Sequence, residues 1–283
     1  MRWRFLATGH GSAAYNMAVD EALLQEMASG GKTPVFRVFG WKPPALSLGY
    51  GQKFHKEVDL EKCRRTGIDV VRRPTGGRAV LHWEELTYSV ICAEDDPVLG
   101  GNVSDTYRLI AQCLVAGLQL FGVEAELERS GSRPVRPRGK SPTTPCFSSL
   151  SRWEVKCGGR KLIGSAQRRV KGAILQHGSL LIGEHHKKLP DLLPPAMDPL
   201  RDTLVRHLDN GSTHLGACTS RPIDFAELTD CLAAGFSRGL QVEMQPGVLS
   251  LEEQQRVEKL IAEKYGNPVN FRPGLRDVPA FGY

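Results

Sequence analysis

Long apolar runs, paired cysteines and aromatic residues are all scarce in this 283-residue sequence. No apolar run approaches the roughly 20 residues that a membrane-spanning helix needs, so no membrane span is expected. The seven cysteines form no CxxC pair, and the N-terminal residues lack the apolar core of a signal peptide. We therefore expect no disulfide framework and a location in the reducing cytoplasm.

Positive charge is only in moderate excess. The chain has 37 Lys and Arg against 31 Asp and Glu, a net charge of +6 that favours acidic partners. No aromatic residues interleave the basic ones and no nucleic-acid module is present, so binding of DNA or RNA is not expected. The most basic segment, residues 129–140 (RSGSRPVRPRGK), is either a solvated loop or a docking surface for an acidic protein.

The hydrophobic pattern predicts an α+β fold. Residues 12–27 predict a helix with Ser12 as its N-cap, and apolar residues at steps of three and four predict another over 104–121. The segments WEVKC and RKLIGSAQRR, joined by Gly158 and Gly159, predict a β-hairpin, and residues 173–182 predict a third adjacent strand. Together these elements indicate a mainly antiparallel sheet flanked by helices.

The composition changes after Glu184. Residues 185–200 are rich in proline and are expected to form a linker, followed by helices over 224–236 and after Ser250, where Glu253 would complete a capping box. We therefore divide the chain into a catalytic domain, residues 1–185, and a linker with a short helical C-terminal extension, residues 186–283. We expect a monomer.

Residues 70–82 (VVRRPTGGRAVLH) form the first candidate site. Gly76 and Gly77 follow a predicted strand and would let the backbone approach a ligand closely, while Arg72 and Arg73 could hold an anion or a carbonyl group. The alternative is a tight turn with solvated arginines. The segment matches neither the G-x-G-x-x-G pattern nor the P-loop, so a standard nucleotide loop is not expected.

Residues 158–182 form the second candidate site. Lys161 follows the hairpin turn beside apolar residues, so its ammonium group would be partly desolvated there, although a surface lysine is the alternative. Gly164, Ser165 and Ala166 are small residues within a predicted strand, where they would open space and expose backbone to a ligand.

The cysteines differ in their surroundings. Cys92, Cys113 and Cys231 lie in apolar segments and are expected in the core. No partner is evident for Cys63 or Cys218, which leaves Cys146 and Cys157 as candidate reactive thiols. A thiol has an ordinary pKa near 8.5 and needs help to react at neutral pH, and a neighbouring ammonium group such as that of Lys161 could provide it.

Four segments in order resemble the biotin/lipoate protein ligase family, in its lipoate branch. The segment RRPTGGRAVLH resembles the acyl-binding signature, and GRKLIGSAQRRVKGAILQHGSLL resembles the lysine-bearing signature. NMAVDEALL and PPALSLGYGQ extend the similarity, which covers about residues 1–185. The resemblance implies a catalytic domain like those of class II aminoacyl-tRNA synthetases and biotin synthetases.

The PCF segment is similar to that of the octanoyltransferases of this family, which carry the acyl group on a loop cysteine. The resemblance implies Cys146 as the acyl acceptor, with Lys161 as the catalytic lysine beside it. It implies octanoyl-acyl carrier protein as donor, a lipoyl domain or glycine cleavage H protein as acceptor, and no cofactor or metal. The implied substrate-binding residues are Arg72, Arg73, Gly76, Gly77, His82, Gly164, Ser165, Ala166 and His177.

Several alternatives remain open at this point. An ATP-dependent lipoate-protein ligase would share the lysine signature without needing the thiol. An octanoyl amidotransferase acting between lipoyl domains would also use a cysteine, and a non-catalytic relative would only bind carrier domains. His82 and His177 could either orient the site by hydrogen bonding or transfer protons.

Overall fold

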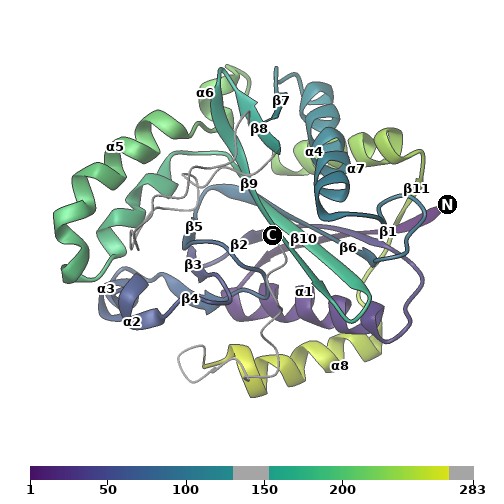
Figure 1. The fold of residues 1–283 in the computed structure, drawn as a ribbon, viewed down its shortest axis with the longest axis horizontal. Helices are drawn as coiled ribbons and strands as arrows, with labels where there is room; N and C mark the ends of the chain where they lie inside the picture. The colour runs from purple at the N-terminus through teal and green to yellow at the C-terminus, as the bar shows by residue number, and fades with distance from the viewer. Residues whose placement is uncertain (130–152, 268–283) are drawn as a thin grey trace.

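Two β-sheets with helices on both faces of the larger one make up the fold of this computed structural model, which describes residues 1–129 and 153–267 (Figure 1). The larger sheet has the strand order β11-β1-β2-β6-β10-β9-β8-β7, and the smaller has the order β4-β3-β5. The strands are β1 (Arg2–Gly11), β2 (Val35–Trp41), β3 (Ala45–Leu48), β4 (Asp69–Arg72), β5 (Val80–His82), β6 (Glu85–Ala93), β7 (Glu126–Arg129), β8 (Trp153–Cys157), β9 (Arg160–Val170), β10 (Ala173–Leu181) and β11 (Glu243–Pro246).

The predicted α+β class is confirmed, and most of the larger sheet is antiparallel. The β8–β9 hairpin turns at Gly158 and Gly159, with φ angles of +55° and +73° that favour glycine. The predicted third strand is β10, which pairs antiparallel with β9 and β6. Parallel pairs occur where β1 meets β2, because the helix between residues 13 and 28 forms the crossover between these strands, and where β1 meets β11, which comes from the far end of the chain.

Helices α4 (Val103–Leu120) and α7 (Phe225–Leu240) cover one face of the larger sheet (Figure 1). Asn102 caps the first and Asp224 the second, each by accepting a hydrogen bond from the backbone near the helix start. Their apolar sides bury Leu114 and Phe236 with sheet residues such as Tyr88 in the largest hydrophobic cluster. The helices predicted over 104–121 and 224–236 are thus confirmed.

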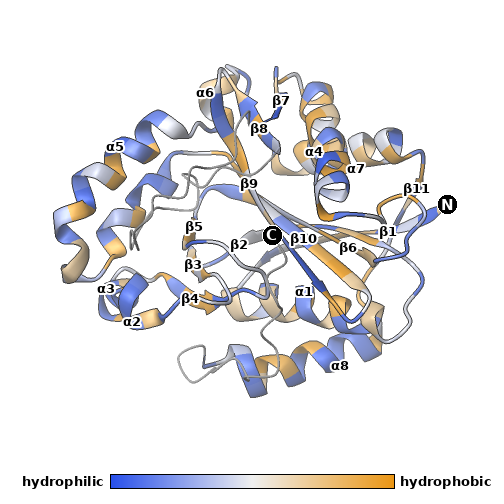
Figure 2. Ribbon diagram, viewed as in Figure 1, coloured by the Kyte–Doolittle hydropathy of each residue, from blue (hydrophilic) through white to orange (hydrophobic). Residues whose placement is uncertain are grey.

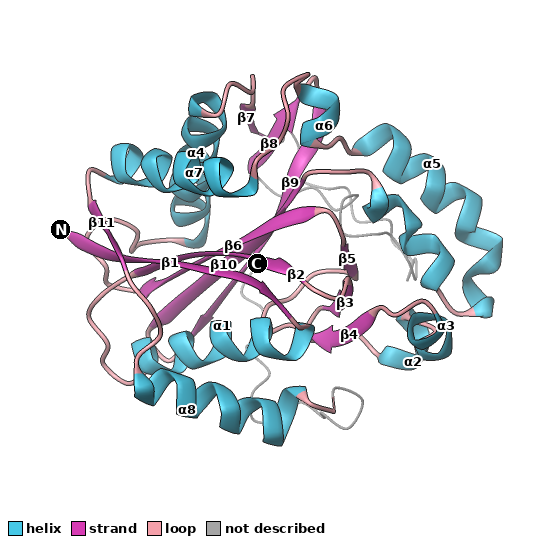
Figure 3. Ribbon diagram, turned by 180° about the vertical axis from the view of Figure 1, so that it is seen from behind, coloured by secondary structure: helices cyan, strands magenta, loops and turns pink. Residues whose placement is uncertain are grey.

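Helices α1 (Ala13–Ala28) and α8 (Leu251–Leu260) lie on the opposite face of the larger sheet (Figure 3). The side chain of Ser12 caps α1, as predicted. Ser250 and Glu253 form the predicted capping box at the start of α8, and Glu253 also binds Arg4 with its carboxylate oxygens at 2.6 and 2.8 Å.

The smaller sheet packs against short helices with a separate apolar cluster that includes Leu46, Leu81 and Leu192. The predicted linker, residues 185–200, forms two 3-10 helices there. The helix that follows, α5 (Arg201–Gly211), carries hydrophobic and hydrophilic residues (Figure 2) and buries Leu204 and Leu208. The remaining helices are α2 (Phe54–Glu57), α3 (Leu60–Arg65), η2 (His185–Leu192), η3 (Pro195–Leu200), α5 (Arg201–Gly211), α6 (Leu215–Cys218) and the π-helical η4 (Ile261–Tyr265).

The C-terminal part of the described chain is built into the same layers as the rest. β11 pairs with β1, α7 packs on α4, and α8 packs on α1. The division of the chain at residue 185 into two units stays a prediction. In the structure, residues from both sides of this boundary pack together in the two large hydrophobic clusters. Within the described ranges, no helix combines the length and apolar character required to cross a bilayer.

The close packing of α4 on α7 generates a first prediction, for Gly235→Ala. A Cβ at Gly235 would lie 2.4 Å from Gly117 N and 2.6 Å from Cys113 O, and these backbone atoms cannot move aside locally. We expect the free energy of unfolding, measured by urea denaturation, to fall by about 2 kcal/mol. Gly211→Ala is the control, because its Cβ would meet only His207 at 4.0 Å. Equal stability of the two variants would contradict this account.

Candidate active site

A β-bulge in β9 turns Lys161 toward one particular face of the larger sheet. The register between β8 and β9 shifts between Val155 and Lys156, which leaves Leu162 as the extra residue of the bulge. Because an extra residue reverses the alternation of side chains along a strand, Lys161 shares a face with Gly164. We call the face of the larger sheet that carries Lys161 and Gly164 the site face. Nothing in the residue pattern of the hairpin predicts the bulge.

Lys161 is almost fully buried on the site face. Its ammonium nitrogen lies 3.1 Å from Glu154 Oε1 on β8, and both side chains are 6% exposed. The backbone carbonyl of Lys161 accepts a hydrogen bond from Thr213 N at 2.9 Å, beside a bridge to Ser212. The lysine is therefore held from two directions, by β8 and by the segment between α5 and α6, and it is not a surface residue.

The three small residues of β9 divide between the two faces. Gly164 pairs with Ser179, and Ala166 pairs with His177, so these two small residues leave room on the site face. Ser165 points to the opposite face, where its hydroxyl lies 2.7 Å from the Tyr88 hydroxyl. The structure therefore brings Gly164 and Ala166 together with Lys161, and it places the Ser165 side chain in the packing behind the sheet.

The glycine turn of the first signature, residues 73–78, is tied to β9 and β10. Arg168 of β9 donates a hydrogen bond to Pro74 O at 2.9 Å. The Thr75 hydroxyl lies 2.6 Å from His177 Nε2 on β10. Gly77 has φ +97°, and its carbonyl passes so close to Gly49 that a Cβ there would lie 2.1 Å from it. The two signatures, about 90 residues apart in sequence, thus meet in space.

The two arginines before this turn are buried, and most of the hydrogen bonds that they donate to described residues go to backbone carbonyls. Arg73 donates to the carbonyls of Ser47 at 3.0 Å, Gly76 at 2.8 Å and Arg78 at 2.7 Å. Arg72 donates to three carbonyls of the loop at residues 49–52. Arg73 therefore holds the glycine turn and Arg72 holds the loop at residues 49–52, while around Gly76 the space for a Cβ is open.

His177 belongs to a buried network that reaches from α1 to the glycine turn. Its Nδ1 lies 3.0 Å from Asp20 Oδ2, and Asp20 pairs with Arg37 at 2.6 Å. Burial acts to raise the pKa of Asp20, but the charge of Arg37 and the hydrogen bond from His177 outweigh it, and the pKa is lowered. Burial lowers the pKa of His177. The neutral imidazole therefore donates from Nδ1 to the carboxylate and accepts from Thr75 at Nε2.

His82 lies in a second network, between the two sheets. Its ring nitrogens lie 2.7 Å from Ser47 Oγ and 2.8 Å from Glu85 Oε1. The ring stacks on Trp41 with 4.1 Å between centroids, and Glu85 also accepts hydrogen bonds from Thr87 and Ser179. Both histidines are thus fixed by two polar partners each, a geometry that favours orienting roles over proton transfer.

The sequence reasoning missed most members of these networks. Asn16 and Asp20 lie four residues apart on the buried side of α1, among apolar residues, and this spacing could have identified them. Glu154 had no such signal, because its pairing with Lys161 depends on the bulge. The polar site residues that were not predicted are Asn16, Asp20, Arg37, Ser47, Thr75, Glu85, Ser89, Glu154 and Arg168.

The described cysteines differ in accessibility, and Cys146 lies outside the described residues. Cys157 hydrogen-bonds to Cys218, a partner that the sequence did not reveal, and burial together with this contact raises its pKa to about 12. Burial also raises the pKa of Cys63 to about 11 and that of Cys113 to about 12. These thiols are poor nucleophiles at neutral pH.

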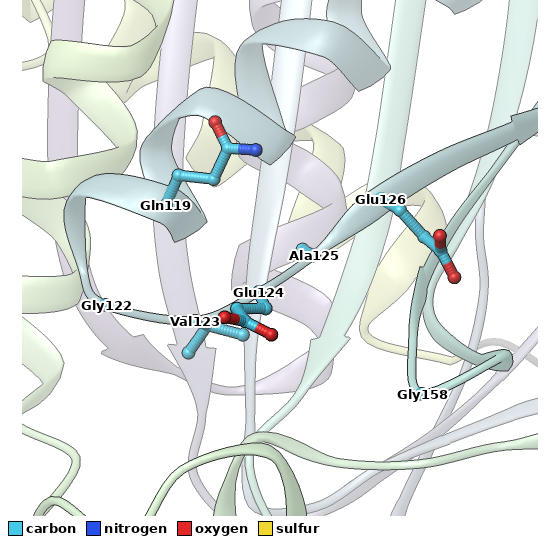
Figure 4. A pocket seen from close by; sticks show the side chains of 7 residues that line it. All are labelled: Gln119, Gly122, Val123, Glu124, Ala125, Glu126 and Gly158. Carbon is cyan, nitrogen blue, oxygen red and sulfur yellow. The ribbon is translucent and has the colours of Figure 1, made fainter.

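Two pockets of opposite charge lie near the signatures. One of about 640 Å³ beside the Gly158 turn is lined by Gln119, Gly122, Val123, Glu124, Ala125, Glu126 and Gly158 (Figure 4), so its charged side chains are acidic. The other, of about 550 Å³, adjoins the glycine turn and is lined by Gly51, Gln52, Lys53, Lys56, Glu57, Gly77 and Arg78. Within the described ranges, no cluster of three or more His, Cys, Asp or Glu side chains could hold a metal ion.

Two solved lipoate ligases have a similar fold. A bipartite lipoate protein ligase studied with its E2 lipoyl domain, from Thermoplasma acidophilum, matches with a TM-score of 0.78 at 23% identity, over 97% of this chain and 99% of that chain. Lipoate-protein ligase A bound with ATP matches with a TM-score of 0.74 at 23% identity, over 94% and 97%. These likenesses define the class of the domain, a lipoate-ligase fold.

Sequence comparison gives the family. "Octanoyltransferase LipM" of Kyrpidia tusciae is 41% identical over 270 residues, which are 95% of this chain and 98% of that protein. The protein of the same name from Bacillus subtilis is 37% identical over 94% of this chain and 96% of its own length. Residues 12–237 match the lipoyl protein ligase A/B catalytic domain. The chain belongs to this family, which confirms the relationship predicted from the four motifs.

His186 contacts Ser212, which forms a backbone bridge with Lys161, and this buried histidine generates a prediction about how stability depends on pH. His186 Nε2 lies 2.8 Å from Ser212 Oγ, and burial lowers the pKa of His186 from 6.5 to about 4. Between these values the unfolded chain binds a proton that the folded chain refuses, so stability falls as the pH falls from 6.5 to 4. We expect this histidine to contribute a loss on the order of 3 kcal/mol.

Denaturant unfolding of the wild type and His186→Gln across this pH range provides the measurement. The variant should show a shallower loss of stability, because it has no imidazole to titrate. His207→Gln, on α5 with an exposed side chain, is the matched control. Parallel curves for wild type and His186→Gln would show that His186 is not protected from protonation in the fold.

Proposed function

We propose that the protein transfers an octanoyl group from octanoyl-acyl carrier protein to a lysine of a lipoyl domain, such as glycine cleavage H protein. The observation that carries this proposal is the identity of 37–41% to proteins named octanoyltransferase over nearly the whole length of both chains. The buried Lys161 and the glycine turn on the site face supply a suitable constellation. The reaction needs no ATP, because forming an amide from a thioester is downhill.

The first step is attack by the Cys146 thiolate on the thioester carbonyl carbon. A new C–S bond forms, the bond to the carrier sulfur breaks, and the carrier leaves as a thiol after taking up a proton. The target lysine amine then attacks the acyl-cysteine, so that a C–N bond replaces the C–S bond and one amine proton is released. Cys146 lies outside the described residues, and its role here comes from the resemblance of the PCF segment to the family.

Lys161 supplies positive charge in this scheme. Its ammonium group sits on the site face, where it would stabilise a nearby thiolate and relay a proton at the incoming amine. Gly164 and Ala166 leave space on the same face, and the glycine turn is hydrogen-bonded to β9 and β10 through Arg168 and His177. Backbone amides of the turn are candidates for polarising the thioester oxygen.

Carrier docking must add to the affinity for the acyl chain. Burying about seven methylene-sized groups stabilises the complex by about 5–6 kcal/mol before ordering costs. Acidic carriers suit the pocket at the glycine turn, where Lys53, Lys56 and Arg78 outnumber Glu57. The basic segment 129–140 is a second candidate contact, although all but its first residue lies outside the described residues.

Two alternative activities remain testable. An ATP-dependent lipoate-protein ligase has the same fold, as the structure solved with ATP illustrates, but its reaction would survive Cys146→Ser. An octanoyl amidotransferase would form the same acyl-cysteine from an octanoylated lipoyl domain instead of an acyl carrier protein. Supplying each donor separately, with and without ATP, distinguishes the three reactions.

Intact mass after incubation with octanoyl-acyl carrier protein tests the acyl-enzyme. We expect one octanoyl adduct on the wild type, none on Cys146→Ala, and a normal adduct on Cys157→Ala, because the Cys157 thiol is held protonated against Cys218. An adduct that survives Cys146→Ala and disappears in Cys157→Ala would move the nucleophile. Wild type that stays unmodified would exclude the covalent route.

Lys161→Gln tests the role of the lysine, since the amide can still hydrogen-bond to Glu154. We expect the single-turnover rate of acylation to fall by about 100-fold or more, the range of general acid–base effects. Circular dichroism should show an unchanged fold. Lys156→Gln, one strand away and paired with Glu128, is the matched control. Wild-type rates for Lys161→Gln at pH 7 would reject a catalytic role.

A further inference from the structure

The pocket at the glycine turn contains lysines that the rest of the fold does not use. It has a volume of about 550 Å³ and lies at the start of α2. Lys53 and Lys56 line it with exposed side chains, and the ammonium group of neither forms an ion pair or hydrogen bond with a described residue. By contrast, Lys156 and Lys187 each pair with a carboxylate. Two ammonium groups in one pocket are therefore available to an anion.

A third cation comes from a different segment of the chain. Arg78 belongs to the glycine turn, whereas both lysines follow the loop at residues 49–52. Burial raises the pKa of Glu57, and the charges of Arg78 and Lys56 act in the opposite direction. Since Glu57 is the single acid among the described lining residues, the pocket has an excess of positive charge supplied from two sides.

Backbone amides add donors to the same surface. Gly51 and Gly77 line the pocket, and within the described residues the backbone N–H of neither donates a hydrogen bond. Free glycine amides combined with cations are typical of phosphate sites, because a phosphate group presents several strong acceptor oxygens at once. The donor set of this pocket therefore suits a phosphate ester.

Hydrogen bonds hold the backbone on both sides of the pocket. Arg72 donates to three carbonyls of the loop at residues 49–52, at 2.7–3.0 Å, and Arg73 donates to two carbonyls of the glycine turn. Tyr50 N donates to Thr75 O at 2.8 Å, which joins the loop to the turn. Because the backbone is already fixed, a bound anion has to order little more than the lysine side chains, which lowers the cost of binding.

We propose that this pocket binds the phosphodiester of the acyl donor, the group through which a carrier protein holds its thioester arm. The proposal rests on the octanoyl transfer proposed above, which supplies the carrier as donor. The turn that contributes Gly77 and Arg78 to the pocket is hydrogen-bonded to β9 and β10 through Arg168 and His177. A phosphate bound there would lie beside the turn that adjoins the site face, so the arm would be anchored next to the reaction site.

Titration calorimetry of the full chain with phosphopantetheine and with pantetheine, which lacks the phosphate, tests the site without any acyl transfer. We expect wild type to bind the phosphorylated compound about tenfold or more tightly than pantetheine. The double variant Lys53→Gln/Lys56→Gln should lose most of this difference. Glu57→Gln should bind phosphopantetheine about threefold more tightly than wild type, because it removes a negative charge from the pocket. A merely structural role of these residues would not give changes of opposite sign.

The double variant Lys32→Gln/Lys259→Gln is the matched control, because it removes the same charge from two exposed lysines that do not line the pocket. It should bind phosphopantetheine within about twofold of wild type, since distant charges are screened by salt. Equal weakening in the control would assign the effect to net charge and overturn the inference. Lys53→Arg/Lys56→Arg should retain most of the affinity, and it provides the test if the glutamine variant does not fold.

Steady-state kinetics connect the pocket to the reaction. With octanoyl-phosphopantetheine as donor, KM should rise about tenfold in Lys53→Gln/Lys56→Gln while kcat stays within about twofold, the pattern of lost substrate binding. Octanoyl-pantetheine should be used equally well by variant and wild type. Carrier protein with and without its arm provides the second comparison, and the variant should weaken binding of the form with the arm more. Equal weakening of both forms would assign the lysines to carrier side chains and overturn the inference.

The outcomes separate this inference from the proposed function. If wild type forms no octanoyl adduct yet binds phosphopantetheine through the two lysines, octanoyl transfer fails and the phosphate site stands. If the adduct forms but phosphopantetheine and pantetheine bind equally, the phosphate site fails and octanoyl transfer stands. ATP is a second source of phosphate. Binding of ATP, and not of phosphopantetheine, that requires the two lysines would assign the pocket to a nucleotide and overturn the inference.

Discussion

The buried ion pair between Asp20 and Arg37 is the interaction on which the rest of the site depends. Both side chains are fully buried, so neither charge is tolerable without the other. Thr8 and Asn16 accept further hydrogen bonds from Arg37, Ser89 donates one to Asp20, and the second Asp20 oxygen accepts from His177. One pair thereby connects α1, β2, β6 and β10, and through His177 it is linked to the glycine turn.

The two faces of the larger sheet have different roles, because successive side chains along each strand point to opposite faces. One face packs α4 and α7 against apolar residues, and Ser165 is used there for hydrogen bonding to Tyr88. The other face carries apolar residues only toward α1 and is polar between the two sheets, where Lys161 and Gly164 lie. The bulge in β9 is the point at which this alternation is broken, and it transfers one charged side chain to the face that uses it.

Local rules predicted much of the fold. The caps at Ser12 and Ser250, the glycine hairpin at residues 158–159 and the helices with regular apolar spacing depend on neighbours within a few residues, so a single sequence reveals them. The parallel pairing of β11 with β1 was missed because it joins strands some 240 residues apart. The 3-10 helices of residues 185–200 were missed because they depend on tertiary packing: η2 packs Leu189 and Leu192 in the cluster of the smaller sheet, and η3 packs Met197 against Leu204.

The sequence by itself determined the family, through four short motifs in order, and it picked out Lys161, Gly164 and His177 as residues of interest. Only the tertiary structure decided what each of them faces. It paired Lys161 with Glu154, turned Ser165 to the other face of the sheet and placed the Cys157 thiol in hydrogen-bonding contact with Cys218. The physical reason is that side-chain direction in a sheet depends on register and bulges. These are set by packing among distant segments and not by the residue itself.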